Sequence, residues 1–143
     1  MCNAGERIEG FFEATFREVL TRENYAHLGK LSKKLTEGYR QIVGKTGLQA
    51  YVASAGVNGA LMFCRQEIRN YRDWLNVDTD LWRHFWFAMV NRGVLAQPYW
   101  WDEQWTISVQ HAEADIDRHL AVFEEVAPAL ARAQQEQKAA VAH

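Results

Sequence analysis

Apolar residues recur at helical spacing in four stretches of the chain, and each stretch predicts a helix with one buried face. The first stretch runs from Glu6 to Leu20. The second follows Thr21, a residue type that caps helix N-termini, and Gly44 or Gly47 supplies its left-handed stop. Two consecutive helices are therefore expected before the first strand.

The third predicted helix follows Asp78 and ends at Gly93, and the fourth begins near Ala112. The buried stripe of the fourth helix is expected to consist of Ile116, Leu120, Phe123, Val126 and Leu130. Pro128 is expected to kink this helix or force a restart, because proline has no N–H and clashes with the preceding turn. The polar tail from Gln134 onward is expected to fray.

The period changes between the second and third helices. Leu48–Ser54 and Gly59–Cys64 are typical of an antiparallel strand pair, and Arg65–Asn76 of a surface loop. Val94–Gln97 and Trp105–Val109 predict two more strands. The order helix, helix, strand, strand, helix, strand, strand, helix indicates an α+β two-layer sandwich. In it, a small antiparallel sheet of about four strands is covered by helices, and residues 1–143 form one domain.

Charge and cysteine usage exclude several classes of protein. Sixteen basic and 18 acidic residues give a net charge of −2 without a basic block, which argues against nucleic-acid binding. Cys2 and Cys64 are too few and too far apart for a disulfide framework. No apolar run approaches the roughly 18 residues of a membrane span, and there is no signal peptide. We therefore expect a cytoplasmic protein without a membrane or nucleic-acid partner.

Metal and phosphate motifs are missing from the sequence. The five histidines are dispersed, and His111 and His119, eight residues apart on a helix, lie roughly 12 Å apart along its axis, too far to share a metal. Gly44–Gly47 spells a GKT string but lacks the upstream glycine of a phosphate loop, so we interpret it as a helix-ending turn. No metal site is expected.

An aromatic and acidic loop between Pro98 and Trp105 carries the candidate chemistry. Asp102 and Glu103 are its acids, and they either orient a substrate or form a solvated loop tip. The interface candidates are Phe87, Trp100, Trp101 and Trp105, for which the alternative is burial in the core.

Five segments of the chain together resemble a known family. They are TRENYAHLGKLSKKLTEGYR, GALMF, IRNYRDW, DTDLWRHFWFAMVNRGVLAQP and QWTISVQHAEADID. The matching positions are Asn70, Tyr71, Asp73, Asn91, Arg92, Gly93, Val94, Pro98, Ser108, His111, Glu113, Asp115, Ile116 and Asp117. The chain resembles the C-terminal small domain of class III, fold-type-I aminotransferases that use pyridoxal phosphate (PLP). The nearest subgroup is that of glutamate-1-semialdehyde 2,1-aminomutase, and the resemblance spans about residues 10–130.

The resemblance implies a domain that closes over an active site held elsewhere. Family catalysis needs a lysine that binds PLP and a phosphate-binding loop, and both belong to a large domain that these 143 residues do not contain. It also implies that Asp102 or Glu103, with Ser108, lies on the substrate side. No catalytic residue, bound cofactor or activity is expected from this chain alone, and a large PLP-binding domain or a homodimer partner is implied. Ala112 stands where the family has a threonine N-cap, a change that weakens a helix start by about 1 kcal/mol.

The alternative hypothesis is an interaction module that kept the fold and lost the chemistry. In that case the aromatic residues of the loop bind another protein or a second copy of the chain. The two hypotheses differ in whether the chain completes a PLP-dependent active site.

Overall fold

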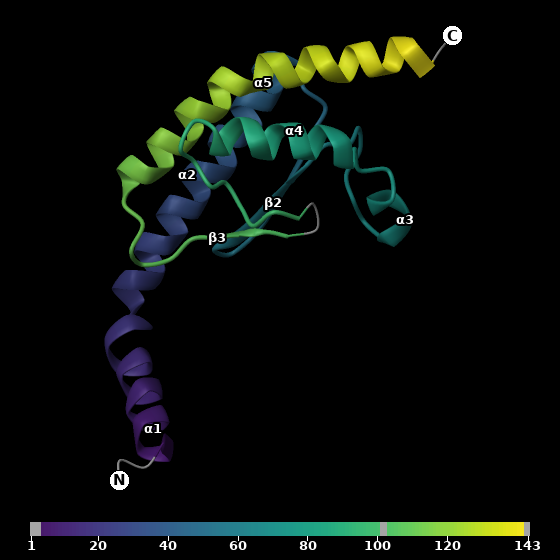
Figure 1. Cartoon of the computed structure of the whole chain (residues 1–143). Helices are drawn as coiled ribbons and strands as arrows, with labels where there is room; N and C mark the ends of the chain where they lie inside the picture. The colour runs from purple at the N-terminus through teal and green to yellow at the C-terminus, as the bar shows by residue number, and fades with distance from the viewer. Residues whose placement is uncertain (1–3, 101–102, 142–143) are drawn as a thin grey trace.

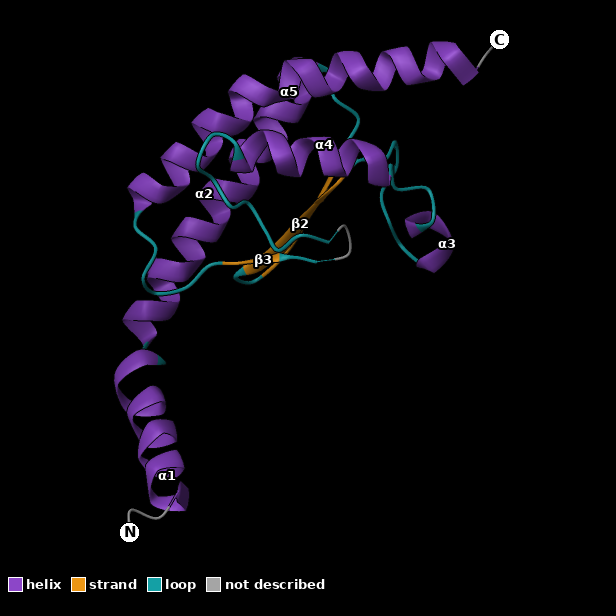
Figure 2. Cartoon of the chain, viewed as in Figure 1, coloured by secondary structure: helices purple, strands orange, loops and turns teal. Residues whose placement is uncertain are grey.

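The computed structural model describes residues 4–100 and 103–141 (Figure 1). The helices are α1 (Ala4–Ala14), the π-helix η1 (Thr15–Val19), α2 (Arg22–Thr46), α3 (Tyr71–Trp74), α4 (Thr79–Val90) and α5 (Glu113–Val141). The strands are β1 (Tyr51–Ala55), β2 (Asn58–Met62) and β3 (Trp105–Thr106). The chain is thus the mixed helix-and-sheet fold that the sequence predicts (Figure 2).

The predicted helix ends are confirmed by their capping contacts. The Thr21 hydroxyl accepts a hydrogen bond from the Asn24 N–H (3.2 Å), and Gly47 ends α2 at a φ of 70°. The Asp78 carboxylate accepts from the Leu81 N–H (2.8 Å) and so opens α4. Gly93 follows α4 at a φ of 78°, which side chains with a Cβ rarely adopt.

The described residues form a three-stranded antiparallel sheet in the order β1-β2-β3. Its register pairs Ala53 with Ala60 and Gly59 with Trp105. The fourth strand predicted at Val94–Gln97 is not present, and β3 is shorter than the predicted Trp105–Val109. Val94 and Gln97 are buried in irregular backbone. The apolar character of this segment therefore reflects burial in the core rather than pairing with another strand.

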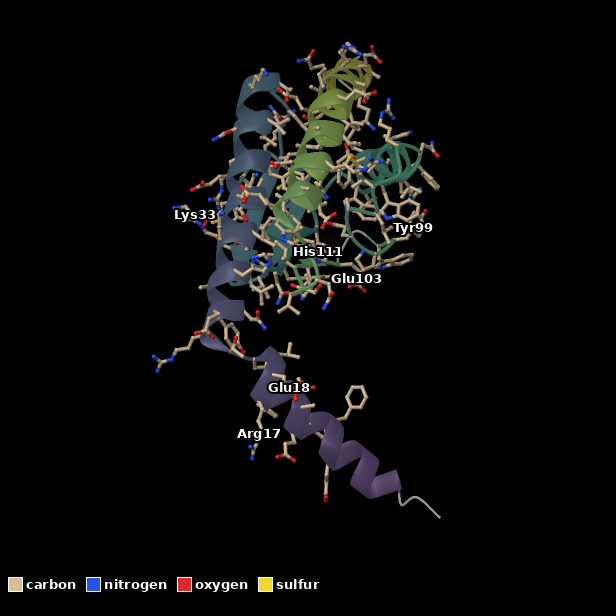
Figure 3. All side chains as sticks on the ribbon, turned by 90° about the vertical axis from the view of Figure 1, so that its left-hand side faces the viewer. Arg17, Glu18, Lys33, Tyr99, Glu103 and His111 are labelled. Carbon is tan, nitrogen blue, oxygen red and sulfur yellow. The ribbon has the colours of Figure 1, made fainter. Side chains whose placement is uncertain are left out.

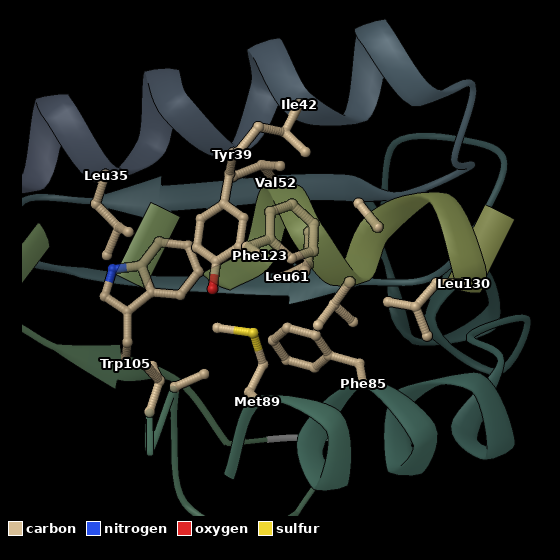
Figure 4. Packing of buried hydrophobic residues seen from close by; sticks show 14 of the residues in the cluster. Leu35, Tyr39, Ile42, Val52, Leu61, Phe85, Met89, Trp105, Phe123 and Leu130 are labelled. Carbon is tan, nitrogen blue, oxygen red and sulfur yellow. The ribbon is translucent and has the colours of Figure 1, made fainter. Parts of the chain in front are cut away.

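The core lies between one face of the sheet and α2, α4 and α5 (Figure 4). Helices α2 and α5 lie side by side, and α4 packs against α5 (Figure 1). Tyr39 of α2 is fully buried, stacks on Trp105 at 5.3 Å between ring centroids and meets Phe123 edge-on at 4.7 Å. Aromatic pairs of this kind contribute roughly 0.5–1.5 kcal/mol each beyond the area they bury. They join the sheet to both long helices.

Of the two alternatives predicted for Pro128 in α5, a kink or a restart, the restart does not occur, and the prediction of a frayed tail from Gln134 is wrong. Helix α5 continues through Pro128 to Val141 without a restart, and its ribbon changes direction along its length (Figure 1). The tail from Gln134 does not fray before Val141, since Gln134 is buried and its amide bonds both the N–H (2.9 Å) and the carbonyl (3.0 Å) of Gln49. The spacing of apolar residues along the sequence gives no sign of these side-chain hydrogen bonds to a distant loop.

Two further segments depart from the predicted pattern. The predicted loop Arg65–Asn76 contains the short helix α3, which begins where the Asn70 side chain accepts bonds from the N–H groups of Arg72 and Asp73. The predicted N-terminal helix is present as α1 and η1, but its described side chains are exposed rather than buried. Figure 1 shows it projecting away from the rest of the fold.

Candidate functional site

Gln97 holds the two ends of the loop between α4 and β3. Its carbonyl accepts a hydrogen bond from the Trp86 indole N–H (2.9 Å), and its side-chain amide donates to the Glu103 carbonyl (3.3 Å). The residue is only 4% exposed, and its Oε1 has no partner within the described residues. Gln97 therefore connects α4 to the residue that precedes Gln104 and β3, and holds these described parts of the loop together. Sequence reasoning missed Gln97, whose only signal is a polar residue between Ala96 and Pro98.

An exposed aromatic surface lies at the start of this loop, and we define it as Trp86, Phe87, Tyr99 and Trp100. Tyr99 meets Trp86 edge-on, with ring centroids 4.6 Å apart. Its ring centroid also lies 5.8 Å from that of Phe87. Phe87, Tyr99 and Trp100 are each 45–50% exposed. Phe87 and Trp100 were singled out from the sequence, whereas Tyr99 was not, although it connects the α4 residues to the loop.

Trp105, the aromatic residue at the other end of the loop, is part of the core. It is 4% exposed and stacks on Tyr39, so for this residue the core alternative holds and it contributes no exposed surface. Gly59 on β2 makes room for its ring, since a Cβ there would lie 2.2 Å from Trp105 Cζ2. Trp101 and Asp102 lie outside the described residues.

Glu103 is exposed and lies beside a hollow of about 460 Å³ on the sheet. The hollow is bounded by β1 and β2, by Trp74 of α3 and by the loop, with Tyr51, Asn58 and Arg40 contributing polar groups. Figure 3 shows Glu103 and Tyr99 at the surface of the body. A carboxylate beside an open hollow can orient a cationic or hydroxyl-bearing group that enters it.

Ser108, the third substrate-side candidate, takes part in the turn that precedes α5. Its N–H donates to His111 Nδ1 (3.0 Å), and its hydroxyl lies 3.0 Å from the same nitrogen. The Ser108 hydroxyl also accepts from the Gln110 N–H (3.3 Å). Since the backbone N–H already occupies His111 Nδ1, that nitrogen is poorly placed to act as a base for the hydroxyl. The geometry favours an ordered turn over a nucleophile.

The start of α5 is held although Ala112 cannot cap it with a side chain. The Asp115 carboxylate accepts from the Ala112 N–H (2.8 Å), and the His27 ring N–H donates to the His111 carbonyl (2.9 Å). Lys30 and Lys34 of α2 both contact Glu113 and lower the pKa of its carboxyl to about 2. The turn before α5 and the start of α5 are thus fixed against α2.

A second hollow of about 320 Å³ lies on the other side of the loop base, next to a buried polar pair. Tyr39 and His119 are within hydrogen-bonding distance (2.5 Å between the hydroxyl and Nε2). Burial lowers the pKa of His119 to about 4 and raises the pKa of Tyr39. His119 is therefore neutral at pH 7, and the hydrogen bond between its Nε2 and the Tyr39 hydroxyl joins α2 to α5.

The described lysine side chains do not fit the covalent attachment of PLP. Lys30, Lys34 and Lys45 pair with acids of α5, and Lys33 lies 3.9 Å from Glu37 on its own helix. All four lie on α2, and none lines either of the two hollows beside the loop. Nor does any group of three or more histidine, cysteine or acidic residues in the described part of the chain have the spacing of a metal site.

Comparison with solved structures connects this arrangement to larger proteins. A glutamate-1-semialdehyde aminomutase from Pseudomonas aeruginosa PAO1 superimposes with a TM-score of 0.73 at 23% identity over 82% of this chain and 26% of that chain. A variant of that enzyme in complex with PMP gives the same TM-score at 22% identity. A transaminase with PLP bound gives 0.59 at 17% identity over 79% of this chain. At these identities the comparison shows a shared fold.

Comparison with curated sequences identifies the relatives. The glutamate-1-semialdehyde 2,1-aminomutase of Desulfatibacillum aliphaticivorans is 30% identical over 113 residues, which is 79% of this chain and 26% of that protein. The enzyme of Aquifex aeolicus is 27% identical over 106 residues. The chain matches the C-terminal part of glutamate-1-semialdehyde 2,1-aminomutases. It spans about a quarter of the length of these relatives, and no family model matches it.

Proposed function

We propose that the chain acts as the small domain of a PLP-dependent aminomutase or aminotransferase. It would close over an active site that a large domain carries. The observation that carries this proposal is the match to one end of proteins about three times as long. The hydrogen bonds of Gln97 to Trp86 and Glu103 support it, because a lid needs a segment anchored on a rigid scaffold.

Within this proposal the loop faces the substrate. Glu103 lies beside the hollow on the sheet and would pair with a charged or hydroxyl group of the substrate or with an arginine of the large domain. Asp102 is the other candidate for this role. Ser108 would act by holding the turn before α5. The exposed members of the aromatic surface, Phe87, Tyr99 and Trp100, would dock on the large domain or on the other subunit of a dimer.

The cofactor would belong to the large domain. PLP supplies an electron sink through which amino groups are transferred. The lysine that holds it would come from the large domain, since the described lysines of α2 are engaged in ion pairs. The chain's own residues would orient the substrate and exclude water from it.

A cofactor-binding experiment tests the division of roles. The purified chain is mixed with PLP, reduced with borohydride and examined by mass spectrometry for PLP on a lysine. We expect only the weak, unsaturable labelling of exposed lysines. Stoichiometric labelling of a single lysine would contradict the proposal that the cofactor site lies elsewhere.

A complementation experiment tests the substrate-side role. The chain is co-expressed with the first three quarters of the Aquifex aeolicus relative, and aminomutase activity is measured. If activity is restored, Glu103→Gln should raise KM or lower kcat at least about tenfold, because an oriented charge contact is lost. Glu136→Gln, an exposed acid on α5, is the matched control and should leave both parameters unchanged.

The aromatic surface favours one alternative function, an interaction module without chemistry. Its test is sedimentation of the purified chain together with pull-down of partners. Trp100→Ala combined with Trp101→Ala should disrupt an assembly that uses this surface. A clean monomer without a partner would count against the alternative.

A further inference from the structure

The backbone of Glu103 is held by hydrogen bonds on both sides. Its N–H donates to the Trp100 carbonyl (3.1 Å), and its carbonyl accepts from Gln97 Nε2 (3.3 Å). Trp100 is a member of the aromatic surface. Gln97 is bonded to another member of that surface, since its carbonyl accepts from the Trp86 indole N–H (2.9 Å). Both bonds that hold this acid beside the hollow on the sheet therefore lead back to the aromatic surface.

The base of this arrangement is the dipeptide of Gln97 and Pro98, which has little freedom to rotate. Proline fixes its own φ at about −65° and restricts the residue before it to extended conformations. The carbonyl of Gln97 accepts from Trp86, and the carbonyl of Pro98 accepts from the Trp100 N–H (2.8 Å). A displacement of either tryptophan is therefore transmitted towards Glu103 rather than absorbed at the base of the loop.

The bond from Gln97 to Glu103 is the longest of these four hydrogen bonds. At 3.3 Å it lies beyond the roughly 2.7–3.2 Å of ordinary N–H···O bonds, whereas the Trp86 bond has the usual length. The Oε1 atom of Gln97 is buried and has no partner within the described residues, so it adds no second anchor to the amide. Glu103 is thus held by a bond that a small shift of Gln97 shortens or breaks.

We propose that Gln97 is a positioning residue, which makes the placement of Glu103 depend on what the aromatic surface contacts. This role rests on the proposed function, in which the aromatic surface docks on the large domain. Docking then sets the Glu103 carboxylate beside the substrate through Gln97. A group that orients a substrate has to be held within about 0.5 Å of its productive position by residues that are themselves fixed. Contact with the substrate and docking of the domain are coupled in this way.

NMR relaxation of the full chain tests the link without the large domain. Gln97→Leu removes the amide but keeps the backbone carbonyl that accepts from Trp86. The amide order parameter of Glu103 should fall by at least about 0.2, towards the values below about 0.6 of flexible backbone. Trp86→Phe keeps an aromatic ring without the N–H donor and should also lower this order parameter. Far-ultraviolet circular dichroism checks that each variant is folded.

The matched control is Trp82→Phe, the same change one turn earlier on α4. The Trp82 Nε1 has no hydrogen-bond partner in the described part of the chain, so the control breaks no such bond and should leave Glu103 unchanged. The variant with both Gln97→Leu and Trp86→Phe separates one link from two independent effects. It should show no larger loss at Glu103 than Gln97→Leu alone, because the link is already cut.

Steady-state kinetics of the complemented enzyme tests the consequence for the substrate. In the complex with the Aquifex aeolicus fragment, Gln97→Leu should change the same parameter as Glu103→Gln, KM or kcat, by at least about threefold. In the Glu103→Gln background it should change neither, because the acid that it positions is already lost. A merely structural role would instead lower kcat equally in both backgrounds, through loss of folded enzyme.

Gln97 has no positioning role if Gln97→Leu leaves the order parameter of Glu103 unchanged, or if its effect and that of Trp86→Phe add. An equal loss of kcat with and without the Glu103 carboxylate would overturn the role as well. An inactive complex of the unaltered chain would count against the proposed function instead, whereas the order parameters decide the link through Gln97 in the chain itself.

Discussion

At the scale of single residues, Gly59 shows how one missing Cβ sets the core. A Cβ there would lie 2.2 Å from Trp105 Cζ2 and 2.7 Å from the Ala53 carbonyl. Gly59→Ala should therefore lower the free energy of unfolding by about 3 kcal/mol, at the upper end for overpacking. Gly29→Ala on α2 is the control, because its Cβ would meet open space, and it should stabilise by about 0.5–1 kcal/mol. Urea denaturation measures both, and equal effects would contradict the clash.

The pair of Tyr39 and His119 predicts a pH dependence of stability. The pKa of His119 is lowered from 6.5 to about 4, so the unfolded chain binds a proton between these values that the folded chain does not. Stability should therefore be constant above about pH 6.5 and fall as pH decreases towards 4. His119 is half-buried as a residue, and we expect a loss of about 1–2 kcal/mol by pH 5.

Urea denaturation at pH 7, 6 and 5 measures this loss. His119→Gln should be less stable at pH 7 but should show a flatter dependence between pH 6.5 and 5. The pKa of the Glu113 carboxyl is lowered from 4.5 to about 2 by Lys30 and Lys34, so its contribution to stability is lost mainly below pH 4.5 and changes little between pH 7 and 5. An unchanged slope in the variant would assign the dependence to another group.

At the scale of elements, the C-terminal part of α5 is held by a side chain rather than by a cap. Gln134 bonds the backbone N–H and carbonyl of Gln49, between α2 and β1. Gln134→Ala should cost about 1–3 kcal/mol, because two backbone groups lose their partner. Gln137→Ala, an exposed change one turn later, should cost less than about 0.5 kcal/mol. Hydrogen exchange of the Gln49 amide should accelerate only in the first variant.

At the scale of the whole molecule, the N-terminal helix and the body are separate in stability. The described side chains of α1 and η1 are exposed, and Thr21 caps α2 without them. A chain that begins at Thr21 should therefore unfold at the same urea concentration as the full chain when both are monomeric. A large loss of stability in the dilute truncated chain would show that the helix packs on the body.

The relation to much longer proteins also belongs to this scale. The chain matches the C-terminal part of relatives about three times its length. None of the helices in the described part of the chain is long and apolar enough to cross a membrane. The cytoplasmic compartment stays a prediction from the composition, and a large-domain partner stays a prediction from the resemblance.

Much of the fold could be predicted because its signals are local. Thr21, Asp78 and Gly93 mark helix ends by bonds or φ angles within a few residues, and all three are confirmed. The stripe of α5 is likewise buried at Ile116, Phe123, Val126 and Leu130, with Leu120 packed beside it. Such signals depend on neighbours in the chain and do not require the rest of the fold.

The candidate site could be predicted only in part. The sequence indicated the loop and Glu103, and the structure places Glu103 beside a hollow. It could not separate Trp100, which is half-exposed, from Trp105, which is buried under Gly59. Both are tryptophans in one loop, and burial depends on β2 and α2, which approach from far along the chain.

By itself the sequence predicted the four long helices, the caps at Thr21 and Asp78 and the mixed helix-and-sheet class, because these follow from local periodicity and residue identity. Its quoted segments also showed the resemblance to aminomutases. Only the tertiary structure decided that Val94–Gln97 forms no strand and that Gln97 ties the loop. It also decided that the apolar face of α1 meets solvent. An apolar stripe predicts that something covers it but does not say what, since the covering surface is contributed by residues distant in the chain or by another molecule.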